Sequence, residues 1–232
     1  MIVFNGVSID GVAPVMIEDI KVSPIRYSPV VRPRAILFGS NFVRMGGGER
    51  TVVITFAILE KNKVLRQEYF RNLSLWAKTD AEYMLELPQD PLRYLQGVCT
   101  DKPEPSTRAW WENKLRLTFA CYENPYWTDK VEKSVACGTS FFVHGDAPPL
   151  MQVRHTLEDA ASNQSYGDGV NTMTFTTIPA GEMVIDVNAQ TAVVGDASIM
   201  QYYQPAGAFI VPKVGTNNIT GTGTVYYRER WE

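Results

Sequence analysis

The stretch TVVITFAIL, residues 51–59, decides the fold class of this chain. Large apolar side chains occupy every second position in it: Val52, Ile54, Phe56 and Ile58. A period of two places these side chains on one face of a β-strand, and the β-branched residues between them favour the same conformation. We therefore expect a half-buried strand here, within a mainly β chain.

The segments on either side continue the β pattern. Gly46–Gly48 precede the stretch and predict a turn that leads into it. Further strands are expected at residues 83–87, 92–100 and 114–122, where β-branched and aromatic residues recur between turn signals. Together these segments predict a sheet built around residues 51–59.

One segment, residues 62–78, departs from this pattern. Asn62 is suited to cap a helix, and apolar and aromatic residues then recur at helical spacing: Leu65, Tyr69, Leu73 and Trp76. We predict one amphipathic helix that covers a face of the sheet. These four residues are expected to form its core stripe rather than a platform for a ligand.

Charge divides the chain into two regions. The first 130 residues carry 17 basic and 15 acidic residues, and the rest carry 5 and 10, so the net charge of −3 separates into +2 and −5. Residues 131–232 show short strands between turn clusters, one of them at Gly215–Asn218, which is typical of a β-sandwich or jelly roll. We expect residues 1–130 to form a β-sandwich or split barrel with one packed α-helix, followed by a C-terminal β-sandwich.

Composition excludes several classes of function. Hydrophobic residues make up 45% of the 232 residues and charged residues 20%, which suffices for a buried core. The nearly neutral net charge provides no basic field for specific nucleic-acid binding, and no apolar stretch approaches the roughly 20 residues of a membrane-spanning helix. The first residues lack the features of a secretory signal, which predicts synthesis in a cytoplasm.

No residue pattern predicts catalysis or metal binding. His144 and His155 lie on different expected strands without a metal-ligand spacing, and the three cysteines form no CxxC pair. The sequence also lacks a Gly-x-Ser-x-Gly nucleophile motif and a phosphate-binding loop. We therefore expect a protein that is not an enzyme and uses neither a cofactor nor a metal.

Residues 21–50 form a basic segment interrupted by prolines. Pro24, Pro29 and Pro33 argue against a helix or a central strand. The arginines of the segment are Arg26, Arg32, Arg34, Arg44 and Arg50. Two interpretations stay open: a solvated loop, or an extended arm whose arginines pair with carboxylates of a neighbouring subunit.

Four segments, taken in order, resemble a known family. They are FNGVSID (4–10), GSNFVRMGGGERTVVITFAIL (39–59), LRLTFACYENPYW (115–127) and GTNNITGTGTVYYRERW (215–231). With the expected helix between the second and third, the chain resembles the distal tail protein (Dit) of long-tailed bacteriophages and prophages over nearly its whole length. The likeness rests on order and spacing, because none of the segments is a strict motif.

The resemblance implies a structural virion protein at the phage tail tip. In this family the N-terminal β domain forms a homohexameric ring, and the C-terminal domain is a galectin-like β-sandwich. The ring is a hub that joins the tail tube and the tape-measure protein to the tail-associated hub protein and the receptor-binding proteins of the baseplate. Transferred to this chain, residues 1–130 would form the ring and residues 21–50 an intersubunit arm.

A carbohydrate-binding module is the alternative function. The C-terminal region could attach to host cell-surface glycans by stacking sugars on aromatic side chains, and the candidates are Tyr166, Tyr202, Tyr203 and Trp231. The region lacks the His-Asn-Arg and Trp-Gly-Glu-Arg pattern with which galectins bind galactose. The resemblance therefore does not carry sugar binding over to this chain.

Overall fold

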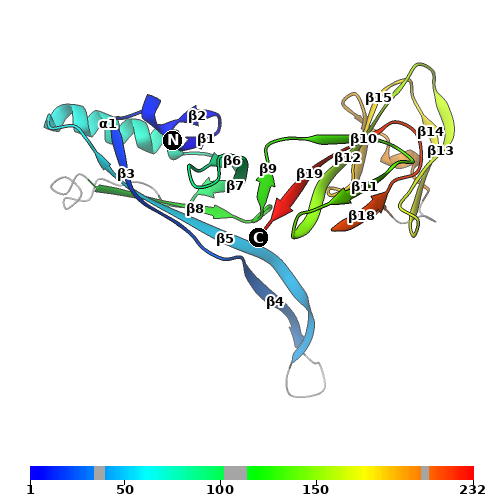
Figure 1. Cartoon of the computed structure of the whole chain (residues 1–232), viewed down its shortest axis with the longest axis horizontal. Helices are drawn as coiled ribbons and strands as arrows, with labels where there is room; N and C mark the ends of the chain where they lie inside the picture. The colour runs from blue at the N-terminus through cyan, green and yellow to red at the C-terminus, as the bar shows by residue number, and fades with distance from the viewer. Residues whose placement is uncertain (34–39, 102–113, 205–208) are drawn as a thin grey trace. The chain divides into compact units, whose positions relative to one another are not determined.

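The chain folds into two compact units, Met1–Trp127 and Thr128–Glu232 (Figure 1). The computed structural model describes residues 1–33, 40–101, 114–204 and 209–232, and for residues 28–33 and 40–47 it describes the backbone alone. The division between the units lies close to the boundary expected at residue 130.

In its described residues, unit 1 is an antiparallel sheet covered by one α-helix. Its strands are β1 (Val3–Phe4), β2 (Val7–Ser8), β3 (Val15–Val22), β4 (Arg26–Pro33), β5 (Ser40–Ile58), β6 (Tyr83–Glu86), β7 (Arg93–Cys99) and β8 (Lys114–Cys121), with a short 3-10 helix at Ile9–Gly11. They pair in the order β2–β1–β6–β7–β8–β5–β3, and β4 pairs with the N-terminal part of β5. The mainly β fold is thus confirmed.

Strand β5 is longer than the sequence predicted. The stretch expected as a strand is its C-terminal half, and the turn expected at Gly46–Gly48 is wrong because β5 runs through these residues. The β4–β5 register shifts between the Tyr27–Gly48 pair and the Pro29–Met45 pair, which places the glycines at a β-bulge. Glycine is common at such bulges, where one strand carries an extra residue.

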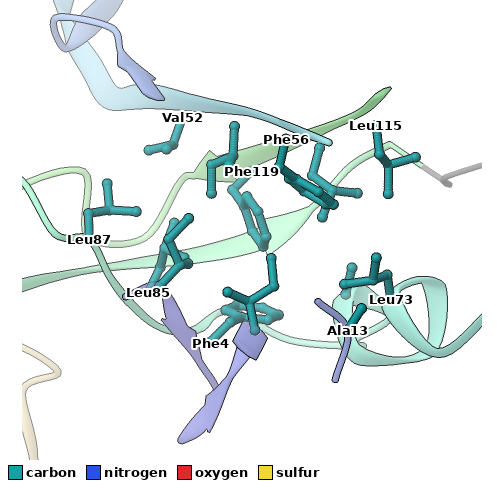
Figure 2. Packing of buried hydrophobic residues seen from close by; sticks show 14 of the residues in the cluster. Phe4, Ala13, Val52, Phe56, Leu73, Leu85, Leu87, Leu115 and Phe119 are labelled. Atoms are coloured by element: carbon teal, nitrogen blue, oxygen red, sulfur yellow. The ribbon is translucent and has the colours of Figure 1, made fainter. Parts of the chain in front are cut away.

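The core of unit 1 lies between the sheet and the helix (Figure 2). Phe56 from β5, Phe119 from β8 and Phe4 from β1 are completely buried. The rings of Phe4 and Phe119 meet edge to face, with centroids 4.9 Å apart and an interplanar angle of 67°. Such aromatic pairs contribute stability beyond their buried area.

The predicted helix is confirmed as α1, Lys63–Ala77. The side chain of Asn62 accepts a hydrogen bond from the N–H of Val64 at 2.9 Å, so Asn62 is the N-cap that the sequence indicated. Near the other end, the indole N–H of Trp76 donates to the carbonyl oxygen of Val7 at 3.0 Å. These bonds anchor both ends of the helix.

The core stripe of α1 differs from the expected one at one edge. Leu73 is buried, and Tyr69 and Trp76 pack against the core while half-buried. Leu65, however, is 40% exposed, and Phe70 is buried in its place with 4% exposure. At 3.6 residues per turn, Leu65 and Phe70 lie on opposite edges of the apolar arc, and the helix turns the Phe70 edge toward the sheet.

In its described residues, unit 2 consists mainly of β-strands. The strands from the unit boundary onward are β9 (Trp127–Asp129), β10 (Lys133–Ala136), β11 (Ser140–Val143), β12 (Ala147–Leu157), β13 (Ala161–Gly167), β14 (Thr172–Ile178), β15 (Gly181–Asp186), β16 (Thr191–Val194), β17 (Ala197–Ser198), β18 (Gly215–Asn218) and β19 (Thr224–Trp231), with a 3-10 helix at Met200–Tyr202. One sheet has the order β17–β16–β15–β12–β19–β10, and β11–β18 and β13–β14 are separate pairs.

The core of unit 2 joins the large sheet to the two smaller pairs. Val153 and Val225 of the large sheet and Phe175 of β14 are completely buried in one cluster. Phe141 of β11 stacks on Tyr227 of β19, with ring centroids 4.8 Å apart. The turn expected at Gly215–Asn218 is wrong, because this segment is β18 and pairs with β11.

Candidate assembly surface

A two-stranded hairpin extends the sheet of unit 1. It consists of β4 and the Ser40–Glu49 part of β5. Strand β8 pairs with β5 only between Arg50 and Ala57, so within the described strands this part of β5 has β4 as its one partner. Figure 1 shows the hairpin continuing past the end of the wider sheet. Its two outer edges therefore present unpaired backbone groups to another chain.

Of the five arginines of the expected arm, the structure describes the side chains of two, and these two lie in different environments. Arg26 is exposed on β4, whereas Arg50 is buried in unit 1 with 4% exposure. The backbone of Arg32 lies in β4 and that of Arg44 in β5, and Arg34 falls outside the described residues. Arg50 is therefore a buried residue of unit 1 rather than part of an accessible arm. In its described residues, the segment consists of the end of β3, the β3–β4 connection and the β4–β5 hairpin.

Hydrogen bonds fix the root of the hairpin. The N–H of Ser23 donates to the carbonyl oxygen of Thr51 at 2.9 Å, and the N–H of Thr51 donates to Oγ of Ser23 at 2.9 Å. The hydroxyl groups of Tyr27 and Tyr126 form a hydrogen bond of 3.0 Å. The tyrosine pair was not predicted, because no local pattern connects residues 99 positions apart.

Gly48 permits a close approach at the same root. A Cβ atom at this position would overlap the side chain of Ile25 and lie 3.0 Å from the ring of Tyr27. Ile25 of the β3–β4 connection and the ring of Tyr27 can therefore pack this closely on β5 because Gly48 has no side chain. The sequence drew attention to this glycine, but as part of a turn.

The described residues offer little reactive chemistry. Burial raises the pKa of the Cys121 thiol to about 12 and that of Cys99 to about 11, so both are protonated at neutral pH. Among the described residues, no three His, Cys, Asp or Glu side chains are grouped so that they could hold a metal ion. Within the same part of the chain, no helix is long and apolar enough to cross a membrane.

The aromatic residues considered for sugar stacking are buried, packed against the core or hydrogen-bonded within unit 2. Tyr166 is completely buried, and its hydroxyl lies 3.3 Å from Nδ1 of His155. Tyr202 and Tyr203 pack against the core of unit 2 while half-buried. The indole N–H of Trp231 donates to the carboxylate of Asp129 at 3.0 Å. The four residues therefore do not form an exposed stacking platform.

Comparison with known proteins gives similarity at the level of structure. No family model matches the sequence, and no curated protein matches it. The Dit protein (gp19.1) of phage SPP1, described as a paradigm of the hub adsorption apparatus in phages that infect Gram-positive bacteria, is similar with a TM-score of 0.74 and 14% identity. The similarity covers 100% of this chain and 98% of the SPP1 chain.

A second similar structure is a chain of the phage p2 baseplate in its activated conformation with Sr. Here the TM-score is 0.50 with 8% identity, over 94% of this chain and 91% of the other. The SPP1 likeness includes both units in one continuous chain. The protein therefore has a Dit-like fold.

Proposed function

We propose that this protein is a structural component of a phage tail tip, a distal tail hub that assembles into a homohexameric ring. The observation that carries the proposal is the whole-chain similarity to SPP1 Dit, which spans 100% of this chain and both of its units. The ring would consist of unit 1, and unit 2 would be its outer domain. No catalytic step, cofactor or specific nucleic-acid contact is part of this function.

The hairpin supports an assembly role on physical grounds. A two-stranded hairpin with no third strand is marginally stable in water. Open strand edges are also sites where another chain can pair. A second copy that covers the β4–β5 hairpin would satisfy both requirements, which fits a ring in which each subunit holds the hairpin of its neighbour.

The partners follow from the position of such a hub. The ring would connect the tail tube and the tape-measure protein to the tail-associated hub protein and to receptor-binding proteins of the baseplate. The location would be the tail tip of the virion after synthesis in the host cytoplasm.

Mass photometry and negative-stain imaging of the full chain test the proposal. We expect a concentration-dependent six-subunit species that appears as rings. A matched variant replaces residues 28–47 by Asn-Gly, which closes a tight turn on the Tyr27–Gly48 pair. This variant should stay folded, with a circular dichroism spectrum that loses only the strand contribution of the deleted residues, but it should remain monomeric. A wild-type chain that remains monomeric at high concentration would contradict the proposal.

A further inference from the structure

A small depression lies at the root of the hairpin, where β3, β4 and β5 meet. Its volume is about 310 Å³. Its lining consists of Lys21, Val22, Ser23, Arg26, Thr51 and Val53. The depression thus combines two cations, two hydroxyl residues and two valines, without an acidic side chain in its lining.

The two cations of the depression differ in their pairing. Nζ of Lys21 lies 3.3 Å from the carboxylate of Asp19, in a pair whose side chains are 75% and 50% exposed. Arg26 stands directly opposite Glu49 in the β4–β5 register, yet no ion pair joins them within the described part of the chain. Arg26 instead lines the depression together with Lys21. Its guanidinium group is available to a carboxylate from outside.

The base of the depression is fixed in place. The two hydrogen bonds between Ser23 and Thr51 hold its polar side, and Val53 lies directly opposite Lys21 in the β3–β5 register. A preformed site costs less ordering entropy on binding than a flexible one. Apolar walls also strengthen a charge-assisted hydrogen bond, because they lower the local dielectric constant.

We propose that this depression binds a carboxylate side chain of a second copy of the chain, with Arg26 as its main hydrogen-bond donor and Lys21 as a second cation. The inference rests on the proposed ring. A copy that covers the open edges of the hairpin along their full length lies next to the hairpin root. Each copy carries 25 acidic residues against 22 basic ones, so carboxylates are available on the partner.

Charge reversal at Arg26 tests the site. Arg26→Glu should raise the dissociation constant of the assembly at least about tenfold, since it replaces an attractive contact by a repulsive one. Arg71→Glu is the matched control, because Arg71 is exposed on α1 and makes the same change in net charge. Mass photometry at several salt concentrations measures the dissociation constants of both variants. Equal assembly of wild type and Arg26→Glu would overturn the proposal.

Chemical coupling tests the identity of the occupant. A carbodiimide joins an amine to a carboxylate in direct contact, so it should couple Lys21 to an acidic residue of the partner. A mixture of ¹⁵N-labelled and unlabelled protein distinguishes coupling between copies from the Lys21–Asp19 pair within one copy. Arg26→Lys supplies a second amine and should couple to the same partner residue. Coupling within single copies alone, in assembled rings of both proteins, would overturn the proposal.

The two proposals fail in different ways. If the wild-type chain forms no ring, the proposed function fails first. If the wild-type chain forms rings and Arg26→Glu forms them equally well, the ring stands and the carboxylate site does not exist. If sulfate ions alone occupy the depression while rings form without a partner carboxylate there, the site inference is also wrong.

Discussion

The two units differ in how they satisfy the backbone groups outside their main sheets. In unit 1 the hairpin leaves strand edges open. In unit 2 polar side chains hold loop backbone in place. The side-chain amide of Asn217, which is 4% exposed, accepts from the N–H of Lys213 at 3.2 Å and donates to the carbonyl oxygen of Lys213 at 2.8 Å. The two strand pairs of unit 2 pack on the core of their own unit, whereas the hairpin of unit 1 runs past the wider sheet and presents a surface that a partner can cover. This difference argues for assembly through unit 1.

The largest expected effects come from the two separate cores. Phe119→Ala in unit 1 and Phe175→Ala in unit 2 each remove a fully buried ring and should each cost about 3–5 kcal/mol. Hydrogen exchange of the full chain, measured by mass spectrometry, should show that each substitution lowers the protection of backbone amides only in the unit that carries it. Equal loss of protection in both units from either substitution would show that the units unfold together.

A smaller effect is expected at the hairpin root. Gly48→Ala would push a methyl group into the side chain of Ile25 and should cost about 1–3 kcal/mol, as overpacking usually does. The control is Gly11→Ala, because a Cβ atom at Gly11 meets nothing within 4 Å. Hydrogen exchange in β4 and the adjoining part of β5 measures the effect. If the hairpin of Gly48→Ala is as protected as that of the control, the close approach at Gly48 does not stabilise the hairpin.

The sequence predicted strongly periodic elements and missed those that depend on distant partners. The C-terminal half of β5 and helix α1 follow from local spacing and an N-cap. The hairpin did not follow, because Gly46–Gly48 and Pro29 disfavour a strand locally and are tolerated only at a bulge and on an edge. Periodicity also defines the apolar arc of α1 without deciding whether Leu65 or Phe70 faces the sheet.

The sequence drew attention to one residue of the proposed carboxylate site. The basic segment drew attention to Arg26, but Arg50 resembled it in sequence and is buried. The difference depends on strand pairing, because Arg50 stands opposite Cys121 in the middle of the sheet while Arg26 lies on the open hairpin. Spacing within residues 21–50 carries no information about that pairing.

An ion pair between a buried carboxylate and a partly exposed lysine tests the internal contacts of unit 2. The carboxylate of Glu229, whose side chain is 3% exposed, accepts from Nζ of Lys133 at 2.9 Å and from the N–H of His144 at 3.0 Å. Burial alone would raise the pKa of Glu229, but these two donors lower it below its ordinary value. Glu229→Gln should cost about 1–2 kcal/mol, since Lys133 is partly solvated. Urea unfolding monitored in unit 2 measures the loss, with Glu182→Gln on the exposed surface as control.

The loop around Asp168 gives the smallest effect and a defined pH dependence. Its carboxylate accepts hydrogen bonds from the N–H groups of Val170 at 2.8 Å, Asn171 at 2.6 Å and Val211 at 2.9 Å. Burial acts to raise the pKa of Asp168, but these donors and the Asn171 side chain outweigh it and lower the pKa from 3.8 to about 2.

Because the folded-state pKa of Asp168 is lowered, its contribution to stability is present above pH 4 and is lost as the pH falls toward 2. The group is partly solvated, so we expect a loss of about 1 kcal/mol in unit 2 over this range. Asp168→Asn should be less stable by a similar amount at pH 7 and should lack this part of the acid dependence. The measurement is the free energy of unfolding of the wild type and of Asp168→Asn between pH 5 and pH 2. Parallel pH profiles would mean that the Asp168 carboxylate does not hold Val170 and Asn171 to Val211, and unit 2 would then lose one of the internal contacts that distinguish it from unit 1.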